Sequence, residues 1–259
     1  MLRRLASVVV LLTLAVIASG PMYASSPSAV LNRHAAPDPP LNSDVRVRMA
    51  NWTAQWWQWI WSSPVHTSPT SSTFQNPLFQ SGAVDCKAAD VTDPQGGRIL
   101  FLAGTTVPSP PPTERTCTVP PGVSLFFPLL NQEYDNVGCC DPGTPPFTFT
   151  VEELKSLVAA AMDSPQELHA SVDGVAVPAY RLKSEVFAYQ MPAIDNVYQY
   201  FGATVPGANW PSTTVYPAVS DGYWALVRPL SRGPHTIQFG GITNTGFTVA
   251  VTYHITVAP

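Results

Sequence analysis

Five of the seven tryptophans in this chain lie within ten residues, in the stretch NWTAQWWQWIW. The cluster consists of Trp52, Trp56, Trp57, Trp59 and Trp61. Because a helix turns about 100° per residue, these side chains with Val45, Met49 and Ile60 would cover most of its circumference. A helix that is apolar on most sides is usually buried. We therefore predict that residues 44–61 form a helix packed into the body of the fold, with a ligand platform as the alternative.

The first 24 residues have the pattern of a secretory signal peptide. A basic pair, Arg3 and Arg4, precedes an apolar run from Leu5 to Ala18, and Met22-Tyr23-Ala24 ends in a small residue. This apolar run is too short to span a bilayer, and the rest of the sequence contains no apolar run that is longer. We expect a secreted or periplasmic protein that is not inserted in a membrane after cleavage.

Charge narrows the range of partners. Cleavage after residue 24 removes two of the 13 basic residues and none of the 17 acidic ones, which leaves a net charge of about −6. The sequence has no basic stripe and no cluster of arginine or lysine. These properties argue against nucleic acid or an anionic membrane as a partner.

Four cysteines, an even number in a chain expected to be exported, favour disulfides. We predict a Cys86–Cys117 disulfide because both residues flank an expected hairpin. Cys139 and Cys140 are adjacent, so they bond elsewhere, stay reduced as a redox pair, or form a strained bond with each other. No CxxC pattern is present, and we predict neither a metal site nor a cofactor.

The body of the chain is predicted to be mainly β. Short apolar runs alternate with Gly- and Pro-rich turns, Asp173-Gly174 has the composition of a type I′ hairpin turn, and residues 247–257 alternate strictly between apolar and polar. Thr150 and Glu153 form a capping box before a further helix near 151–162. We expect a flexible leader over 25–43 and, over 44–259, a single β-sandwich domain of jelly-roll or immunoglobulin-like Greek-key type.

The longest irregular stretch, residues 195–221, is rich in aromatic side chains. Its members are Tyr198, Tyr200, Phe201, Trp210 and Tyr216. Long loops in compact domains are usually functional or disordered, and aromatic faces beside short polar groups suit sugars. We predict ligand binding by Tyr198, Tyr200, Trp210 and Tyr216, with a small core inside the loop as the alternative. Trp224 and Arg228 form either a structural stack or one wall of a pocket.

An acidic stretch, residues 131–141, contains Glu133, Asp135 and Asp141. Paired carboxyl groups perform glycoside hydrolysis, and residues 133 and 135 would share one face of a strand. His66, in the loop after the tryptophan-rich helix, would complete an acid/base pair with Asp135 if the fold joins them. A turn and a weak calcium site are the alternatives.

Three segments resemble a recurrent family of uncharacterised bacterial secreted proteins. They are WWQWIWSSPVHTSP, FLAGTTVPSPPPTERTCTVPPGVSLFFPLLN and SDGYWALVRPLSRGPHTIQFGG. The resemblance implies export and one integrated architecture, with the tryptophan-rich helix as part of the domain. It implies no activity and identifies no site residues.

Three functions remain open at this point. The first is an exported β-sandwich that binds carbohydrate or associates with the cell envelope, with a polysaccharide or envelope glycan as partner. The second is a secreted polysaccharide hydrolase or lyase that uses Glu133 or Asp135 with His66. The third is a structural or interaction protein without a small ligand. The sequence lacks GxSxG, HExxH, P-loop and GxGxxG motifs, which argues against lipase, zincin, NTPase and Rossmann chemistry.

Overall fold

The computed structural model describes residues 43–93, 95, 97–106, 111–137, 148–201 and 214–259. The predicted signal peptide, Cys139, Cys140, Asp141 and Trp210 lie outside these residues. In chain order the elements are α1 (Ser43–Ser62), β1 (Gly82–Ala83), β2 (Asp90–Thr92), β3 (Arg98–Phe101), β4 (Thr113–Val119), β5 (Val123–Asp135), α2 (Val151–Met162), β6 (Glu167–Val172), β7 (Val175–Ala176), β8 (Tyr180–Lys183), β9 (Phe187–Gln190), α3 (Val197–Tyr200), β10 (Thr214–Val227), β11 (Gly233–Ile242) and β12 (Thr248–Val257).

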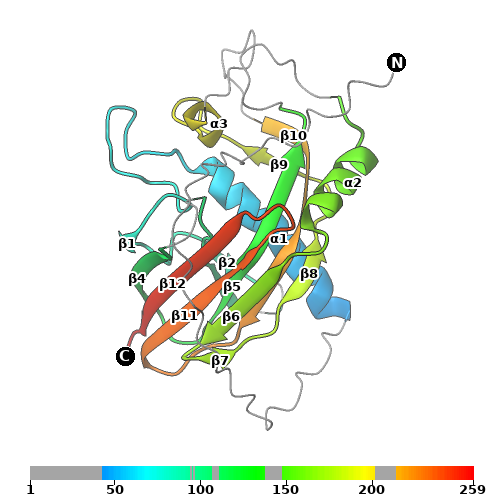
Figure 1. Cartoon of the computed structure of the whole chain (residues 1–259). Coiled ribbons are helices and arrows are strands. Elements are labelled where there is room, and N and C mark those ends of the chain that lie inside the picture. Colours follow the sequence, from blue (N-terminus) through cyan, green and yellow to red (C-terminus); the bar gives the residue numbers. More distant parts are fainter. Residues whose placement is uncertain (1–42, 94, 96, 107–110, 138–147, 202–213) are drawn as a thin grey trace, which may run out of the picture.

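The described strands form two open mixed sheets, so the prediction of a mainly β chain is confirmed (Figure 1). The first sheet has the order β1-β4-β12-β11-β6-β7, and the second has the order β2-β3-β5-β10-β8, with β9 also paired to β10. The pairs β1·β4, β4·β12 and β3·β5 are parallel, and the other pairs are antiparallel. The alternation in 247–257 is typical of a half-buried antiparallel strand, and β12 runs antiparallel to β11 on one side but parallel to β4 on the other. Alternation reports which face is buried and says nothing of the direction of a neighbouring strand.

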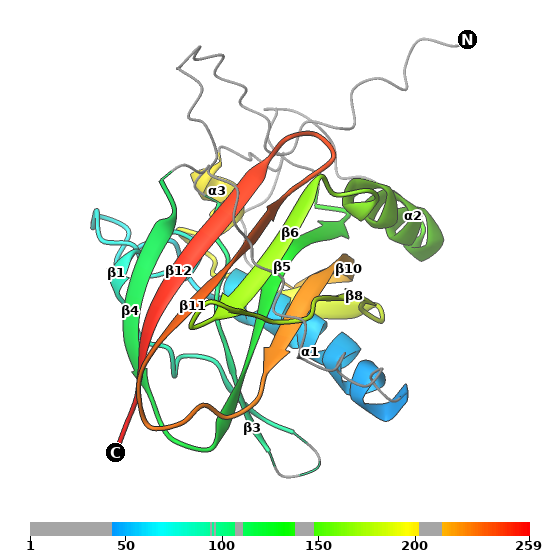
Figure 2. The ribbon, with the colours of Figure 1, turned by 60° about the horizontal axis from the view of Figure 1, so that its bottom comes forward.

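One buried cluster is shared by the two sheets. Phe127 of β5 stacks on Phe239 of β11 at 4.5 Å between ring centroids, and Tyr253 of β12 stacks beyond it. The helix α1 covers the other face of the second sheet (Figure 2). There Trp56 of α1 is fully buried, lies 5.5 Å from the Trp224 ring and donates its indole N–H to the carbonyl of Leu102. The tryptophan-rich helix is thus part of the body of the fold.

Several elements form where short sequence motifs predicted them. Thr150 caps α2, and both hydrogen bonds of the capping box with Glu153 are present. Asp173 and Gly174 have φ angles of 51° and 79°, as a type I′ turn requires, and they join β6 to β7. These positions need only near neighbours in the sequence to specify them.

Two segments that the sequence did not assign firmly are strands. Residues 131–135, for which the sequence allowed a strand or a turn, extend β5, and residues 214–221, expected in an irregular stretch, form the first half of β10. Residues 132–135 pair antiparallel with residues 218–221. Gly222 lies in this ladder, where an added Cβ would come 2.7 Å from the Asn131 Cβ. Local composition does not specify the strand over 214–221, because it pairs with distant parts of the chain in β5 and β9.

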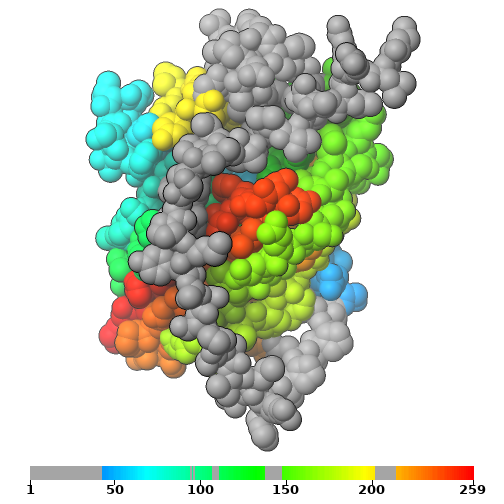
Figure 3. Space-filling model, in the orientation of Figure 1, coloured from blue at the N-terminus to red at the C-terminus, as the bar shows by residue number. Residues whose placement is uncertain are grey.

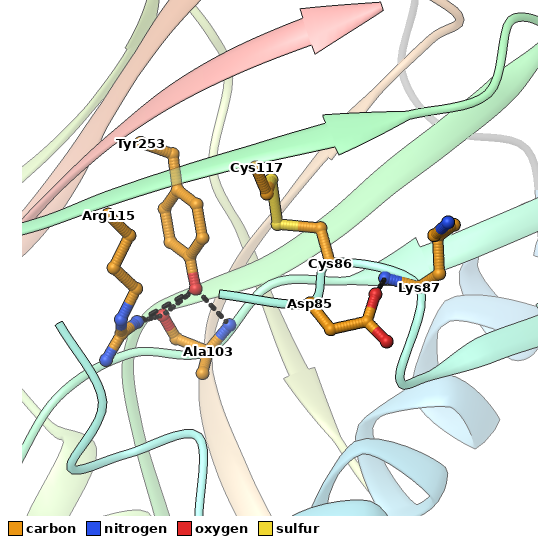
Figure 4. Close-up of a disulfide and its surroundings, with 7 residues drawn as sticks. All are labelled: Asp85, Cys86, Lys87, Ala103, Arg115, Cys117 and Tyr253. Atoms are coloured by element: carbon orange, nitrogen blue, oxygen red, sulfur yellow. Dashed lines mark hydrogen bonds between the residues drawn. A yellow bond between two sulfur atoms is a disulfide. The ribbon is translucent and has the colours of Figure 1, made fainter. Parts of the chain in front are cut away.

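The predicted disulfide is present between Cys86, in the segment before β2, and Cys117 of β4, with Cα atoms 5.8 Å apart. It joins that segment to the first sheet (Figure 4). No helix in the described part of the chain has the length and apolarity needed to cross a membrane.

Candidate functional site

Two carboxyl groups lie next to each other on the face of β5 that α1 covers. Glu133 and Asp135 pair across the ladder with Ser220 and Ala218 of β10, and Ala218 belongs to the cluster beneath α1. Glu133 is only 7% exposed. Strand geometry therefore places both groups on one face, as the sequence predicted.

Asp135 is held by two tyrosines. The hydroxyls of Tyr189 from β9 and Tyr198 from α3 both donate to its Oδ2, the latter at 2.7 Å, and the Val137 N–H donates to Oδ1 at 2.6 Å. Burial raises the pKa of Asp135, and these hydrogen bonds partly oppose that rise. Burial and the nearby negative charge raise the pKa of both tyrosines well above the usual value.

Glu133 has a different environment, because its Oε1 is buried and has no hydrogen-bond partner within the described chain. Burial, followed by the charge of Asp135, raises the pKa of Glu133 well above its ordinary value, while the nearby Trp61 indole opposes the shift. The Trp61 N–H is itself buried without a hydrogen bond. Among the described residues, no lysine, arginine or histidine pairs with either carboxyl group, so the raised pKa favours a protonated Glu133.

Stacked aromatic rings enclose this carboxyl pair. The Trp61 ring lies 5.8 Å from that of Tyr189 and 5.3 Å from that of Tyr198, and Trp57 stacks on it at 5.4 Å. Tyr198, which we predicted as a ligand contact, is therefore a buried part of this junction at 8% exposure.

His66 does not join the carboxyl pair through any hydrogen bond in the described chain. Its Nδ1 lies 2.9 Å from Asp195 Oδ1, and its backbone N–H donates to Asp195 Oδ2 at 2.7 Å. The partner of His66 is thus Asp195 rather than the predicted Asp135, because the backbone at Val65 also bonds to that of Asp195.

The predicted binding aromatics are divided between the core and the surface. Trp224 is 0% exposed and stacks on Phe126 at 4.9 Å, so this prediction of a pocket wall is wrong. The exposed Arg228 lies beyond the end of β10 and makes no cation–π contact with Trp224. Tyr216 is 64% exposed on β10.

Tyr200 is 45% exposed and belongs to an aromatic group that we call the Tyr200 surface, made of His66, Phe74 and Tyr200. The Tyr200 ring lies 5.9 Å from that of His66 and 6.1 Å from that of Phe74. Figure 3 shows the two chain segments side by side, the cyan one after α1 and the yellow one at α3.

Two hollows flank Trp59 near the end of α1. The first hollow has a volume of about 220 Å³, and its polar lining includes Ser63, Gln75, Gln80 and Asp85. The second hollow has a volume of about 380 Å³ and is lined by Gln58, Trp59, Ser62, Ala188, Tyr189 and Gln190. The sequence placed Trp59 on a helix predicted to be buried, with a ligand platform as the alternative, and its ring is half-buried and lines both hollows. The remaining lining residues come from α1, from several strands and from the segment over 75–88, and they carry no common motif.

A buried guanidinium, that of Arg115, is part of the lining of the first hollow. Figure 4 shows this side chain next to Ala103 and Tyr253. Arg115 of β4 is 1% exposed and donates to the carbonyls of Pro77, Gln80, Ala103 and Gly104 and to the Tyr253 hydroxyl. All five of its N–H groups are therefore used within the protein. Arg115 has a structural role here and leaves no donor for a ligand.

The described residues include no group of three or more side chains suited to hold a metal ion. Comparison of the chain with known protein families, curated proteins and solved structures found no match.

Proposed function

We propose that this chain is an exported carbohydrate-binding protein with a β-sandwich of jelly-roll or immunoglobulin-like type, and that the first hollow is its binding site. Export is supported by the N-terminal sequence pattern and by the resemblance to bacterial secreted proteins. The Cys86–Cys117 disulfide fits an oxidising compartment.

The composition of the first hollow is the observation that carries the proposal. An aromatic wall from Trp59 offers a flat face to the C–H groups of a sugar ring. The Asp85 Oδ1 accepts the Lys87 N–H at 2.9 Å, and its Oδ2 has no partner in the described chain. Gln75 is exposed and makes no hydrogen bond through its side chain there. Amide and carboxylate groups match hydroxyls, which both donate and accept.

The Tyr200 surface supports the same function, because Phe74 directly precedes Gln75 of the hollow. The Gln80 amide also donates to the carbonyl of Gln75 at 2.9 Å and fixes this part of the rim. A glycan that leaves the hollow would meet aromatic faces there.

Affinity electrophoresis of the purified protein tests the proposal, with gels that contain soluble cellulose, starch, xylan, mannan, chitin or pectate derivatives. We expect at least one neutral polysaccharide to retard the protein, and Trp59→Ala to abolish the retardation. Tyr216→Ala, at an exposed aromatic outside the hollow, is the matched control, and circular dichroism checks folding. Retardation by no glycan, or loss only in Tyr216→Ala, would contradict a site at Trp59.

The carboxyl pair favours a second candidate function, a polysaccharide hydrolase or lyase. Glu133 and Asp135 share one strand face, and the pKa of Glu133 is raised as a general acid needs. Trp57 and Trp61 cover the pair, so we rank this function below binding. Release of reducing ends that is lost in Glu133→Gln would reverse the ranking, whereas no response to any glycan would favour a structural or interaction protein.

A further inference from the structure

Trp59 lines both hollows, although each hollow has its own polar residues. Its ring lies 6.2 Å from that of Trp56 at 82° and 6.4 Å from that of Phe101 at 48°. These contacts hold the ring from the protein side. In the described chain its indole N–H has no hydrogen-bond partner, unlike that of Trp56, which is bonded to Leu102. Trp59 is therefore a fixed aromatic group between the two hollows, and its indole N–H can donate a hydrogen bond to a ligand.

The second hollow has a neutral and polar lining. Gln58 of α1 donates to the Ala188 carbonyl at 2.8 Å, which holds the helix against β9 at this point. Ser62 donates to the Trp59 carbonyl at 3.0 Å, so its oxygen can still accept a hydrogen bond. Gln190, exposed at the end of β9, donates its amide N–H to the Thr214 hydroxyl. Among the residues that the structure describes, no charged side chain lines this hollow.

The shared wall argues that one ligand uses both hollows. The first hollow, at about 220 Å³, is smaller than the roughly 300 to 1,000 Å³ of ordinary ligand sites, and the second, at about 380 Å³, lies at the lower end of that range. Trp59 lines both. A ligand confined to the first hollow would leave the part of Trp59 that lines the second hollow without a contact.

Charge limits the class of sugar. In the first hollow, the Arg115 donors are all used, and Asp85 carries the negative charge that remains available to a ligand. A carboxylate of an acidic sugar would be repelled by Asp85 and would find no free cation in either lining.

We infer that the ligand is a neutral oligosaccharide that spans both hollows, with sugar units on each side of Trp59. This inference rests on the proposed carbohydrate binding. It predicts that affinity grows with chain length, because a monosaccharide reaches only one hollow, whereas a longer chain makes contacts in both at the cost of a single association.

Isothermal titration calorimetry with saccharides of one to six units tests this, using ladders from cellulose, starch, xylan, mannan and chitin, with oligogalacturonates as the acidic probe. We expect the tetrasaccharide of the bound ladder to bind at least about 10-fold more tightly than its monosaccharide, and oligogalacturonates not to bind. Gln75→Ala in the first hollow and Gln190→Ala in the second should each weaken tetrasaccharide binding roughly 3- to 10-fold. Gln166→Ala, at an exposed glutamine before β6, should have no effect and serves as the matched control.

The outcomes separate the inference from the function on which it rests. If a neutral ladder binds but its mono- and tetrasaccharides bind equally, or Gln190→Ala leaves the affinity unchanged, the two-hollow site is wrong while carbohydrate binding stands. Preference for oligogalacturonates overturns the neutral class. If no ladder binds, carbohydrate binding itself fails, and the inference fails with it. Because both glutamines are exposed, their variants should fold even where Trp59→Ala does not.

Discussion

Arg115 and Glu133 are both buried ionisable side chains on strands, but their surroundings are opposite. All five N–H groups of Arg115 donate to four backbone carbonyls and one hydroxyl. Glu133 has a buried oxygen without any partner and a second carboxyl group two residues away. A buried charge costs several kcal/mol unless hydrogen bonds replace its water. Arg115 therefore stabilises the fold, whereas Glu133 is a group that the fold tolerates and that shifts toward its neutral form.

The comparison has a structural consequence. Arg115 ties the segment at Pro77 and Gln80 and the end of β3 at Ala103 to β4, so it joins loops to sheet. Glu133 and Asp135 instead lie where α1, α3 and β9 meet β5. Unsatisfied buried groups and perturbed carboxyl pKa values gather at functional sites more often than at structural ones.

Substitution of Arg115 should give the largest effect. Arg115→Met keeps most of the side-chain volume but leaves four carbonyls and a hydroxyl without their donors, so we expect the free energy of unfolding to fall by about 3 to 5 kcal/mol. Urea denaturation followed by tryptophan fluorescence measures it. Arg115→Lys retains the positive charge but has fewer N–H donors, so its free energy of unfolding should lie between those of the native protein and Arg115→Met. A Met variant within about 1 kcal/mol of the native protein would remove the contrast with Glu133.

Glu133→Gln should act in the opposite direction and depend on pH. Because the folded protein raises the pKa of Glu133, its contribution to stability is fully present below the unfolded pKa and is lost as pH rises through the folded pKa. Glutamine does not ionise, so at neutral pH we expect the variant to be more stable by about 1 to 3 kcal/mol, with little difference at pH 4.

Urea denaturation of both proteins between pH 4 and pH 8 measures this difference. Parallel pH profiles for the native protein and Glu133→Gln would show that folding does not change the pKa of Glu133. Glu152→Gln, at an exposed glutamate in the first turn of α2, is the matched control and should leave the profile unchanged.

The smallest effect is expected at the tyrosines of the carboxyl junction. Tyr198→Phe removes one of two hydroxyls that donate to Asp135 Oδ2, so the free energy of unfolding should fall by about 1 kcal/mol. In the native protein this hydrogen bond stabilises the charged form of Asp135. The loss of stability in Tyr198→Phe should therefore increase as pH rises and Asp135 ionises. The same denaturation series measures it, with Tyr200→Phe at the exposed ring as control. Equal losses in both variants would show that the Tyr198 hydroxyl carries no special weight.

Sequence reasoning succeeded where neighbours in the chain decide the structure. The Thr150 cap, the Asp173-Gly174 turn and the tryptophan stripe on α1 all depend on spacings of a few residues. It also placed Glu133 and Asp135 on one face, because strand geometry requires this of residues two apart.

The remaining features depend on contacts between distant residues. No pattern in the sequence around Asp135 predicts its hydrogen bonds with Tyr189 and Tyr198. None around His66 predicts its pairing with Asp195. Arg115 carried one usable signal, because it alternates in phase with Cys117 and Val119 in β4 and so falls on their side of the strand. The hollows gave no signal, since Gln75, Asp85 and Gln190 come together only in the folded chain.

The position of β12 has a consequence for the order of folding. It is the last strand in sequence, yet it lies inside the first sheet, with β4 on one side and β11 on the other. Its Val251 pairs with Thr113, so β4 is synthesised long before the strand that completes its pairing. Such non-local pairing slows folding and leaves a strand edge open until its partner arrives. The nascent chain therefore stays incompletely folded until β12 is available, and during that time the unpaired edge of β4 is open to association with other strands.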